Sequence, residues 1–245
     1  MKYALLALAS TTAFAVDIPF YIGTYTKPGG SQGIYRATID SETGKMSEPK
    51  LAAQSKNPSF LAVDLKGRYV FAANEGDGPT VSAYAVQPDG MLKPLNQSSA
   101  KGAGPCHVWV DGAGKNVLVA NYGGGSVASL PIRADGSVGD ATAFVQHTGS
   151  SVNPSRQKEP HAHGIYLSPD DRFAYVPDLG QDKVMIYQFD AEKGTLTPTI
   201  RRPASFRPAA ARGTSRSIRR AASPTSSMKC SRPSPPSSTT PRPAR

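Results

Sequence analysis

The chain has 245 residues, with 28 Lys and Arg against 18 Asp and Glu, and a formal net charge of +10. Residues 201–245 contain ten Arg, one Lys and no acidic residue, which leaves 17 basic and 18 acidic side chains in residues 1–200. A nearly neutral body argues against a nucleic-acid-binding domain, so we do not expect a nucleic acid as partner.

Cysteine content and hydropathy narrow the class of protein further. The two cysteines, Cys106 and Cys230, fall one in the body and one in the basic tail, which argues against a disulfide framework or a cysteine zinc site. No apolar run reaches the roughly 18 residues that a membrane-spanning helix needs, so we expect no membrane partner either.

The first residues have the pattern of a secretory signal. Lys2 is followed by an apolar run over residues 4–9, and small residues at 13 and 15 form a cleavage site after Ala15. We therefore predict a signal peptide over residues 1–15 and a periplasmic or secreted protein. The alternative is a buried N-terminal helix, and with it a cytoplasmic protein.

The body contains a repeated unit of short β-rich runs separated by Gly and Asp turns. Its markers Asn74, Asn121 and Asp178 are 47 and 57 residues apart. A period of roughly 40 to 50 residues built in this way is typical of β-propeller blades. We predict an all-β fold over residues 16–200, with about four blades. The aligned runs are 57–64, 67–74 and 80–84, then 104–111, 114–121 and 126–130, then 159–167, 171–178 and 183–187.

Each unit predicts the same sequence of strands. The first run is the inner strand, a tight turn reverses the chain, and the second run is a strand buried on both faces by neighbouring blades. The third run alternates, and an outer strand follows. An earlier stretch, residues 21–45, predicts a partial unit that lacks its own inner strand.

The repeat stops at residue 200, and residues 201–245 consist mainly of Arg, Ser, Pro, Ala and Thr. This composition indicates a disordered tail, and a basic tail that binds nucleic acid is one interpretation. We favour a frameshift. When codons for Ala211 to Lys229 are read two bases later, they can encode Pro-Arg-His-Phe-Ala-Phe-His-Pro-Ser-Gly-Arg-Phe-Ala-Tyr-Val-Ile-Asn-Glu, which is another blade start, turn and buried strand. We therefore predict a propeller that is interrupted before its ring closes.

Candidate catalytic residues are concentrated in residues 156–163. His161 and His163 share one face of a strand and can act as general acid and base on an ester. Alternatives are zinc ligands, which would need a third partner, and buried histidines that hydrogen-bond between blades. Arg156 is suited to bind a carboxylate or phosphate, although a solvated loop explains it equally well.

Three residues of the preceding units are candidates for substrate binding. His107 takes the corresponding place one blade earlier, and Asn74 and Asn121 end buried strands, where they either face the site or bond turns. The chain has no Gly-x-Ser-x-Gly elbow, which argues against a serine hydrolase. We expect no metal and no cofactor.

Several motifs together resemble a known family, the seven-bladed β-propeller lactonases, which includes propeller-type 6-phosphogluconolactonases and fungal carboxymuconate cyclase. The resemblance runs from about Ile18 to Pro198. It implies hydrolysis of a small-molecule sugar lactone, typically 6-phospho-D-glucono-1,5-lactone, without a metal, and a monomer if the ring is complete. Alternatives are an exported non-catalytic binding module and a cyclase-like lactonising enzyme. The motifs are residues 21–26, 57–61, 72–75, 119–122 and 159–163.

The resemblance also implies site residues. One is a histidine of the His-Ala-His motif, here His161 or His163. The others are an arginine in Gly-Pro-Arg-His and a glutamate that ends the next buried strand, and both exist only in the shifted frame. One blade earlier, Cys106 stands at the place of that arginine. The resemblance therefore implies impaired activity for the chain as written.

Overall fold

The computed structural model describes residues 16–76, 78–199 and 204–205. This part of the chain is all β and contains no helix, as the sequence predicts. The predicted signal peptide lies outside it. The predicted tail does too, except Ala204–Ser205, which form a short strand. The strands are β1 (Asp17–Ile22), β2 (Gly33–Asp40), β3 (Lys50–Gln54), β4 (Pro58–Val63), β5 (Tyr69–Asn74), β6 (Thr80–Val86), β7 (Leu92–Ser99), β8 (Pro105–Val110), β9 (Asn116–Asn121), β10 (Ser126–Pro131), β11 (Ala143–Gln146), β12 (Tyr166–Leu167), β13 (Phe173–Asp178), β14 (Lys183–Asp190), β15 (Thr195–Pro198) and β16 (Ala204–Ser205).

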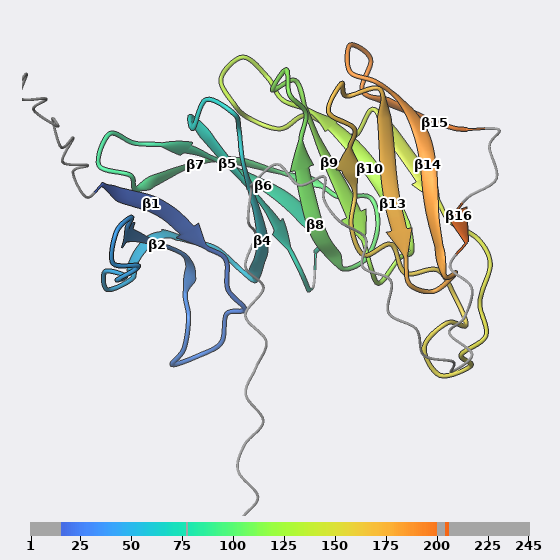
Figure 1. The fold of residues 1–245 in the computed structure, drawn as a ribbon, viewed down its shortest axis with the longest axis horizontal. Helices are drawn as coiled ribbons and strands as arrows, with labels where there is room; N and C mark the ends of the chain where they lie inside the picture. The colour runs from blue at the N-terminus through green and yellow to red at the C-terminus, as the bar shows by residue number, and fades with distance from the viewer. Residues whose placement is uncertain (1–15, 77, 200–203, 206–245) are drawn as a thin grey trace, which may run out of the picture. The chain divides into compact units, whose positions relative to one another are not determined.

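The strands form four antiparallel sheets that follow one another along the chain (Figure 1). The first blade is β1–β2–β3 and lacks an inner strand, as predicted. The second is β4 to β7, the third is β8 to β11, and the fourth is β12 to β15, with β16 paired to β14. About four blades of a propeller are thus confirmed, each a meander of neighbouring strands.

Apolar cores lie between successive blades. One core joins the first and second blades around Ile34 and Val70, one joins the second and third around Phe71 and Val119, and one joins the third and fourth. Strand β9 is buried at every residue because blades cover both of its faces. This arrangement explains why the second run of the repeat is apolar throughout.

Strand β13 departs from that expectation. Its residues alternate between buried and more exposed positions, and Tyr175 is 38% exposed. Ala174 and Val176 face the third blade and pack in the core there. The opposite face is exposed because no described sheet covers it, so burial on both faces is wrong for this strand.

The inner strand of the fourth blade is much shorter than the predicted run over residues 159–167. Only Tyr166–Leu167 form β12, and Ala162 makes an isolated bridge to Asp178. Pro177, on the partner strand, has no N–H to donate to a regular ladder. The Pro177 carbonyl accepts the His163 N–H at 3.0 Å, and the Asp178 carboxylate accepts the His161 N–H at 2.8 Å.

The turn between the first and second strands of a blade is held in the same way in each complete unit. In the second and third blades, Gly67 and Gly114 take φ of +67°, where side chains are unfavourable. Asp171 occupies the equivalent place in the fourth blade with φ of +54°. Aspartate tolerates this region because its short polar side chain bonds locally.

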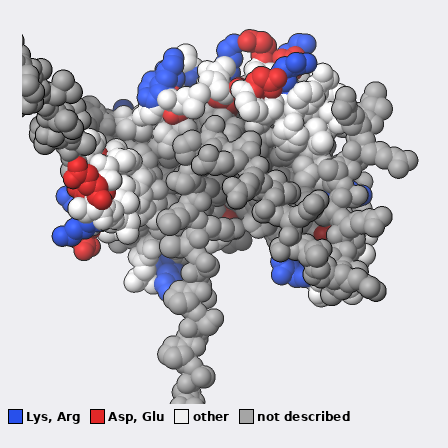
Figure 2. Space-filling model, in the orientation of Figure 1, with Lys and Arg blue, Asp and Glu red and all other residues white. Residues whose placement is uncertain are grey.

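Charged side chains on the visible face of the blades are mixed in sign. In Figure 2, basic and acidic groups lie next to one another along the upper rim and at the left. No helix among the described residues is long and apolar enough to cross a membrane.

Candidate functional site

Most of the predicted site residues lie at one end of the blades, where the inner strands begin and the second strands finish. The ladders pair Pro58 with Asn74 and Pro105 with Asn121 at this end. Residues just beyond the second strands, such as Tyr122, therefore meet residues that start the inner strands. We call this end of the blades the site end.

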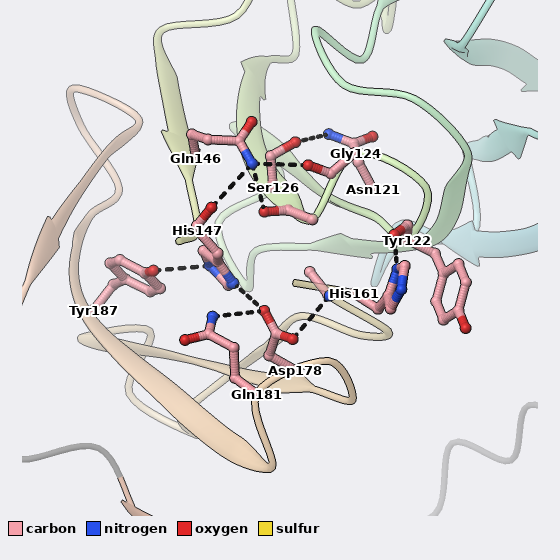
Figure 3. A network of polar contacts seen from close by, with 12 residues as sticks. Asn121, Tyr122, Gly124, Ser126, Gln146, His147, His161, Asp178, Gln181 and Tyr187 are labelled. Carbon is pink, nitrogen blue, oxygen red and sulfur yellow. Dashed lines mark hydrogen bonds and ion pairs between the residues drawn. The ribbon is translucent and has the colours of Figure 1, made fainter. Parts of the chain in front are cut away.

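Tyr122 and His161 form the centre of the site. Their rings stack with centroids 4.6 Å apart and an angle of 15°, and His161 Nδ1 lies 3.0 Å from the Tyr122 carbonyl oxygen (Figure 3). Because a carbonyl oxygen only accepts, Nδ1 carries the proton. In the tautomer with the proton on Nδ1, Nε2 carries the lone pair that a general base requires.

Two more predicted residues contact Tyr122. The ring of His163 meets it edge-on, at 5.2 Å and 81°, and Arg156 Nη2 donates to its hydroxyl at 3.3 Å. His163 and Arg156 are exposed, whereas His161 is half-buried. The two histidines and the arginine of residues 156–163 are therefore brought together around one aromatic side chain that belongs to the neighbouring blade.

Asn74 and Asn121 have their amide nitrogens hydrogen-bonded within the fold. Asn74 Nδ2 donates to Ser55 Oγ and the Lys56 carbonyl at 3.0 and 2.7 Å, and it is 5% exposed. Asn121 is fully buried, and its Nδ2 donates to the Ala100 carbonyl at 3.0 Å. Both amides tie the segment that precedes an inner strand to the end of the second strand.

His107 lies between blades. It is 3% exposed, and its ring contacts Phe60 at 4.2 Å and Tyr166 at 4.7 Å. Its Nδ1 accepts the Ile165 N–H at 3.4 Å. Its contacts are thus those of an inter-blade core residue, although its strand neighbour Cys106 reaches the site: Cys106 Sγ is 3.7 Å from the carbonyl oxygen of His163.

A carboxylate also lies at the site end, at the finish of β5. Glu75 Oε1 accepts hydrogen bonds from Tyr25, at 2.9 Å, and from Ser59. Burial raises the pKa of Tyr25, and the bond to Glu75 raises it further. The phenol therefore stays protonated at neutral pH and donates to Glu75.

Sequence reasoning missed His147, which follows β11 and lies outside the repeated motifs. Its Nδ1 is 2.6 Å from Asp178 Oδ2, and its Nε2 is 2.9 Å from the Tyr187 hydroxyl. Burial alone would raise the pKa of Asp178, but hydrogen bonds from His147, the His161 N–H and Gln181 outweigh it and hold that pKa below its usual value. Burial, helped by the charge of Asp178, raises the pKa of Tyr187 to about 12.

The described part of the chain contains no group of side chains arranged to hold a metal ion. No three His, Cys, Asp or Glu side chains there converge as metal ligands would. The groups that do converge, an imidazole with a free ring nitrogen and a guanidinium, are suited to activating water and holding an anion.

Comparison with known proteins agrees with this architecture. Residues 19–215 match the family model of the seven-bladed β-propeller lactonases. A 6-phosphogluconolactonase of Bacillus subtilis is 38% identical over 179 residues, which are 72% of this chain and 50% of that protein.

Solved structures of other proteins are also similar to this chain. The periplasmic gluconolactonase of Pseudomonas aeruginosa matches with a TM-score of 0.68 at 33% identity, over 74% of this chain and 53% of that one. A protein from Lactobacillus plantarum matches with a TM-score of 0.70 at 32% identity, over 78% and 54%. This chain spans about half the length of these relatives. It belongs to the seven-bladed β-propeller lactonase family.

Proposed function

We propose that this chain carries a lactonase site that hydrolyses a sugar lactone, with 6-phospho-D-glucono-1,5-lactone as the first substrate to test. The observation that carries the proposal is the geometry of His161, whose Nδ1 is fixed on the Tyr122 carbonyl while Arg156 is held on the same tyrosine. The name of the Bacillus subtilis relative supports the choice of substrate.

The residues can perform the reaction as follows. His161 Nε2 takes a proton from a water molecule, which adds its oxygen to the lactone carbonyl carbon. The tetrahedral oxyanion then collapses, the bond to the ring oxygen breaks, and the proton on Nε2 passes to that oxygen. Arg156 binds the phosphate of the substrate or stabilises the oxyanion. His163, at the edge of Tyr122, is the second candidate for proton transfer.

The remaining parts of the site belong to the frame-restored version, in which the reading frame after about residue 200 is corrected. The family pattern would supply an arginine and a glutamate from that segment, so we expect lower activity from the chain as written. Sequencing of the locus tests the frameshift, because an unbroken frame with nothing propeller-like encoded downstream contradicts it.

A lactone-panel assay tests the function. The full chain and the frame-restored version are assayed with phosphorylated and unphosphorylated sugar lactones and with muconolactone. We expect the frame-restored protein to open a sugar lactone and His161→Ala to lower kcat by about 100-fold or more, which is typical for the loss of a general base. Equal rates in His161→Ala, His163→Ala and the parent would remove both histidines from the mechanism. Turnover of none of the lactones would favour a binding module.

We also propose that the protein is exported and that it is a monomer if its ring is complete. The pattern of residues 1–15 supports export, and the related Pseudomonas aeruginosa gluconolactonase is described as periplasmic. Because an exported protein works outside the cytoplasm, the unphosphorylated sugar lactones of the same panel are the second substrate class to test. Cell fractionation with N-terminal sequencing tests cleavage after Ala15, and size-exclusion chromatography with light scattering tests the monomer.

A further inference from the structure

A pair of titratable side chains lies buried beneath the site, and the mechanism above does not use it. The side chains of His147 and Asp178 are 1% and 0% exposed, and His147 lies between Asp178 and Tyr187 (Figure 3). A buried polar network of this kind is costly unless its members are bonded, and here both ring nitrogens of His147 have partners.

The direction of one hydrogen bond in the network is fixed by chemistry. Asp178 is a carboxylate at neutral pH, because its pKa lies below the usual value, and a carboxylate only accepts. His147 Nδ1 therefore carries a proton and donates to Oδ2, as Gln181 Nε2 also does at 3.0 Å. The other oxygen, Oδ1, accepts the His161 N–H at 2.8 Å.

The backbone of His147 is bonded to the turn that carries Tyr122. The His147 N–H donates to the Gly125 carbonyl at 3.0 Å, and Gly125 is three residues after Tyr122 in that turn. Gln146 Nε2 adds bonds to the Gly124 and Gly125 carbonyls at 2.8 and 3.0 Å. One residue thus holds both partners of the stacked pair: its backbone holds the tyrosine turn, and its side chain, through Asp178, holds the histidine.

We propose that His147 is a positioning residue for the lactone site: its Nδ1–H orients Asp178, which fixes the backbone of His161 and keeps His161 Nδ1 on the Tyr122 carbonyl. The inference rests on the proposed function for its kinetic consequence. Its structural consequence, the tautomer of His161, is independent of any substrate.

Two substitutions of His147 distinguish a positioning role of its Nδ1–H from a role in filling the buried space. His147→Asn keeps an N–H donor at the place of Nδ1, whereas His147→Gln moves the amide to the place of Nε2 and leaves Asp178 Oδ2 without that donor. Nitrogen-15 NMR of the full chain reads the His161 tautomer. We expect the Nδ1–H form in the parent and in His147→Asn, and a mixture with the Nε2–H form in His147→Gln. In the frame-restored protein, kcat should fall about 10- to 100-fold in His147→Gln, with KM within about twofold, and recover in His147→Asn.

Leu196→Ala is the matched control, because Leu196 is buried in the same inter-blade core and its aliphatic side chain makes no hydrogen bond to the network. It should lower thermal stability while leaving the His161 tautomer and kcat unchanged. The inference is overturned if His147→Gln keeps the parental tautomer, if His147→Asn behaves like His147→Gln, or if Leu196→Ala shifts the tautomer equally. Absence of any lactone turnover in the parent would overturn the proposed function, and the NMR comparison would still decide the role of His147.

Discussion

His107 packs against Phe60 across the boundary between the third and second blades, with ring centroids 4.2 Å apart. The same imidazole touches Tyr166 of the fourth blade, so one side chain links the inner strands of three blades. A residue in this place contributes to stability through packing, because its removal leaves a cavity that three rigid sheets cannot close.

His107→Ala should therefore lower the free energy of unfolding by about 3 kcal/mol, the usual scale for a large-to-small change in a core. His107→Phe keeps the ring and should recover most of the loss, apart from the bond to the Ile165 N–H. Urea unfolding followed by circular dichroism measures both. A stable His107→Ala protein with a raised KM for the lactone would instead assign His107 to substrate binding.

Tyr122 allows the two roles of its side chain to be separated. Tyr122→Phe removes only the hydroxyl that accepts from Arg156, so KM should rise about threefold, since the bond is exposed. Tyr122→Ala also removes the ring beneath His161, and kcat should fall by about 10-fold or more because the imidazole loses its stacking partner. Steady-state kinetics on the frame-restored protein distinguishes the two. Equal kinetics for the two variants would show that the stacking has no catalytic role.

The blade repeat was predictable from the sequence because its periodicity has a local cause. Each turn requires a residue that tolerates positive φ, and each second strand requires an apolar run, so Gly67, Gly114 and Asp171 recur at matching places. The open face of the fourth blade was not predictable in this way. Tyr175 reads as a residue of a strand buried on both sides, and its exposure depends on which sheets the chain supplies.

The site was only partly predictable, for a related reason. His161, His163 and Arg156 stand close together in sequence, and the structure keeps them together. Tyr122 directly follows a strand of another blade, and the sequence could not show that its carbonyl meets an imidazole 39 residues away. His147 belongs to no motif at all, and its partner Asp178 reads as a strand-end marker.

The phenol of Tyr187 should make stability depend on pH in the alkaline range. Its pKa is raised from 10.0 to about 12 in the fold, so the unfolded chain loses this proton first as pH rises. The stabilisation is complete below pH 10 and is lost between pH 10 and 12, with a size of about 2–3 kcal/mol. Tyr187→Phe should show a shallower loss of stability over that range. Parallel curves for the two proteins would contradict the raised pKa.

Asp171 joins the fourth blade to the third, since its Oδ2 accepts the Gly112 N–H at 2.6 Å. Asp171→Asn keeps both the acceptor and the tolerance of positive φ, and it removes a charge that lies near Asp111 and Asp170, so stability should be unchanged or slightly higher. Asp171→Gly suits the positive φ of the backbone but loses the acceptor, which should lower the free energy of unfolding by about 1 kcal/mol. Asp171→Ala loses the acceptor and is strained at φ of +54°, which adds roughly another 1 kcal/mol. The urea midpoint of unfolding should therefore be highest for Asp171→Asn, lower for Asp171→Gly and lowest for Asp171→Ala. A glycine variant as stable as the parent would show that the hydrogen bond to the Gly112 N–H contributes nothing, and that the aspartate serves only the conformation of its turn.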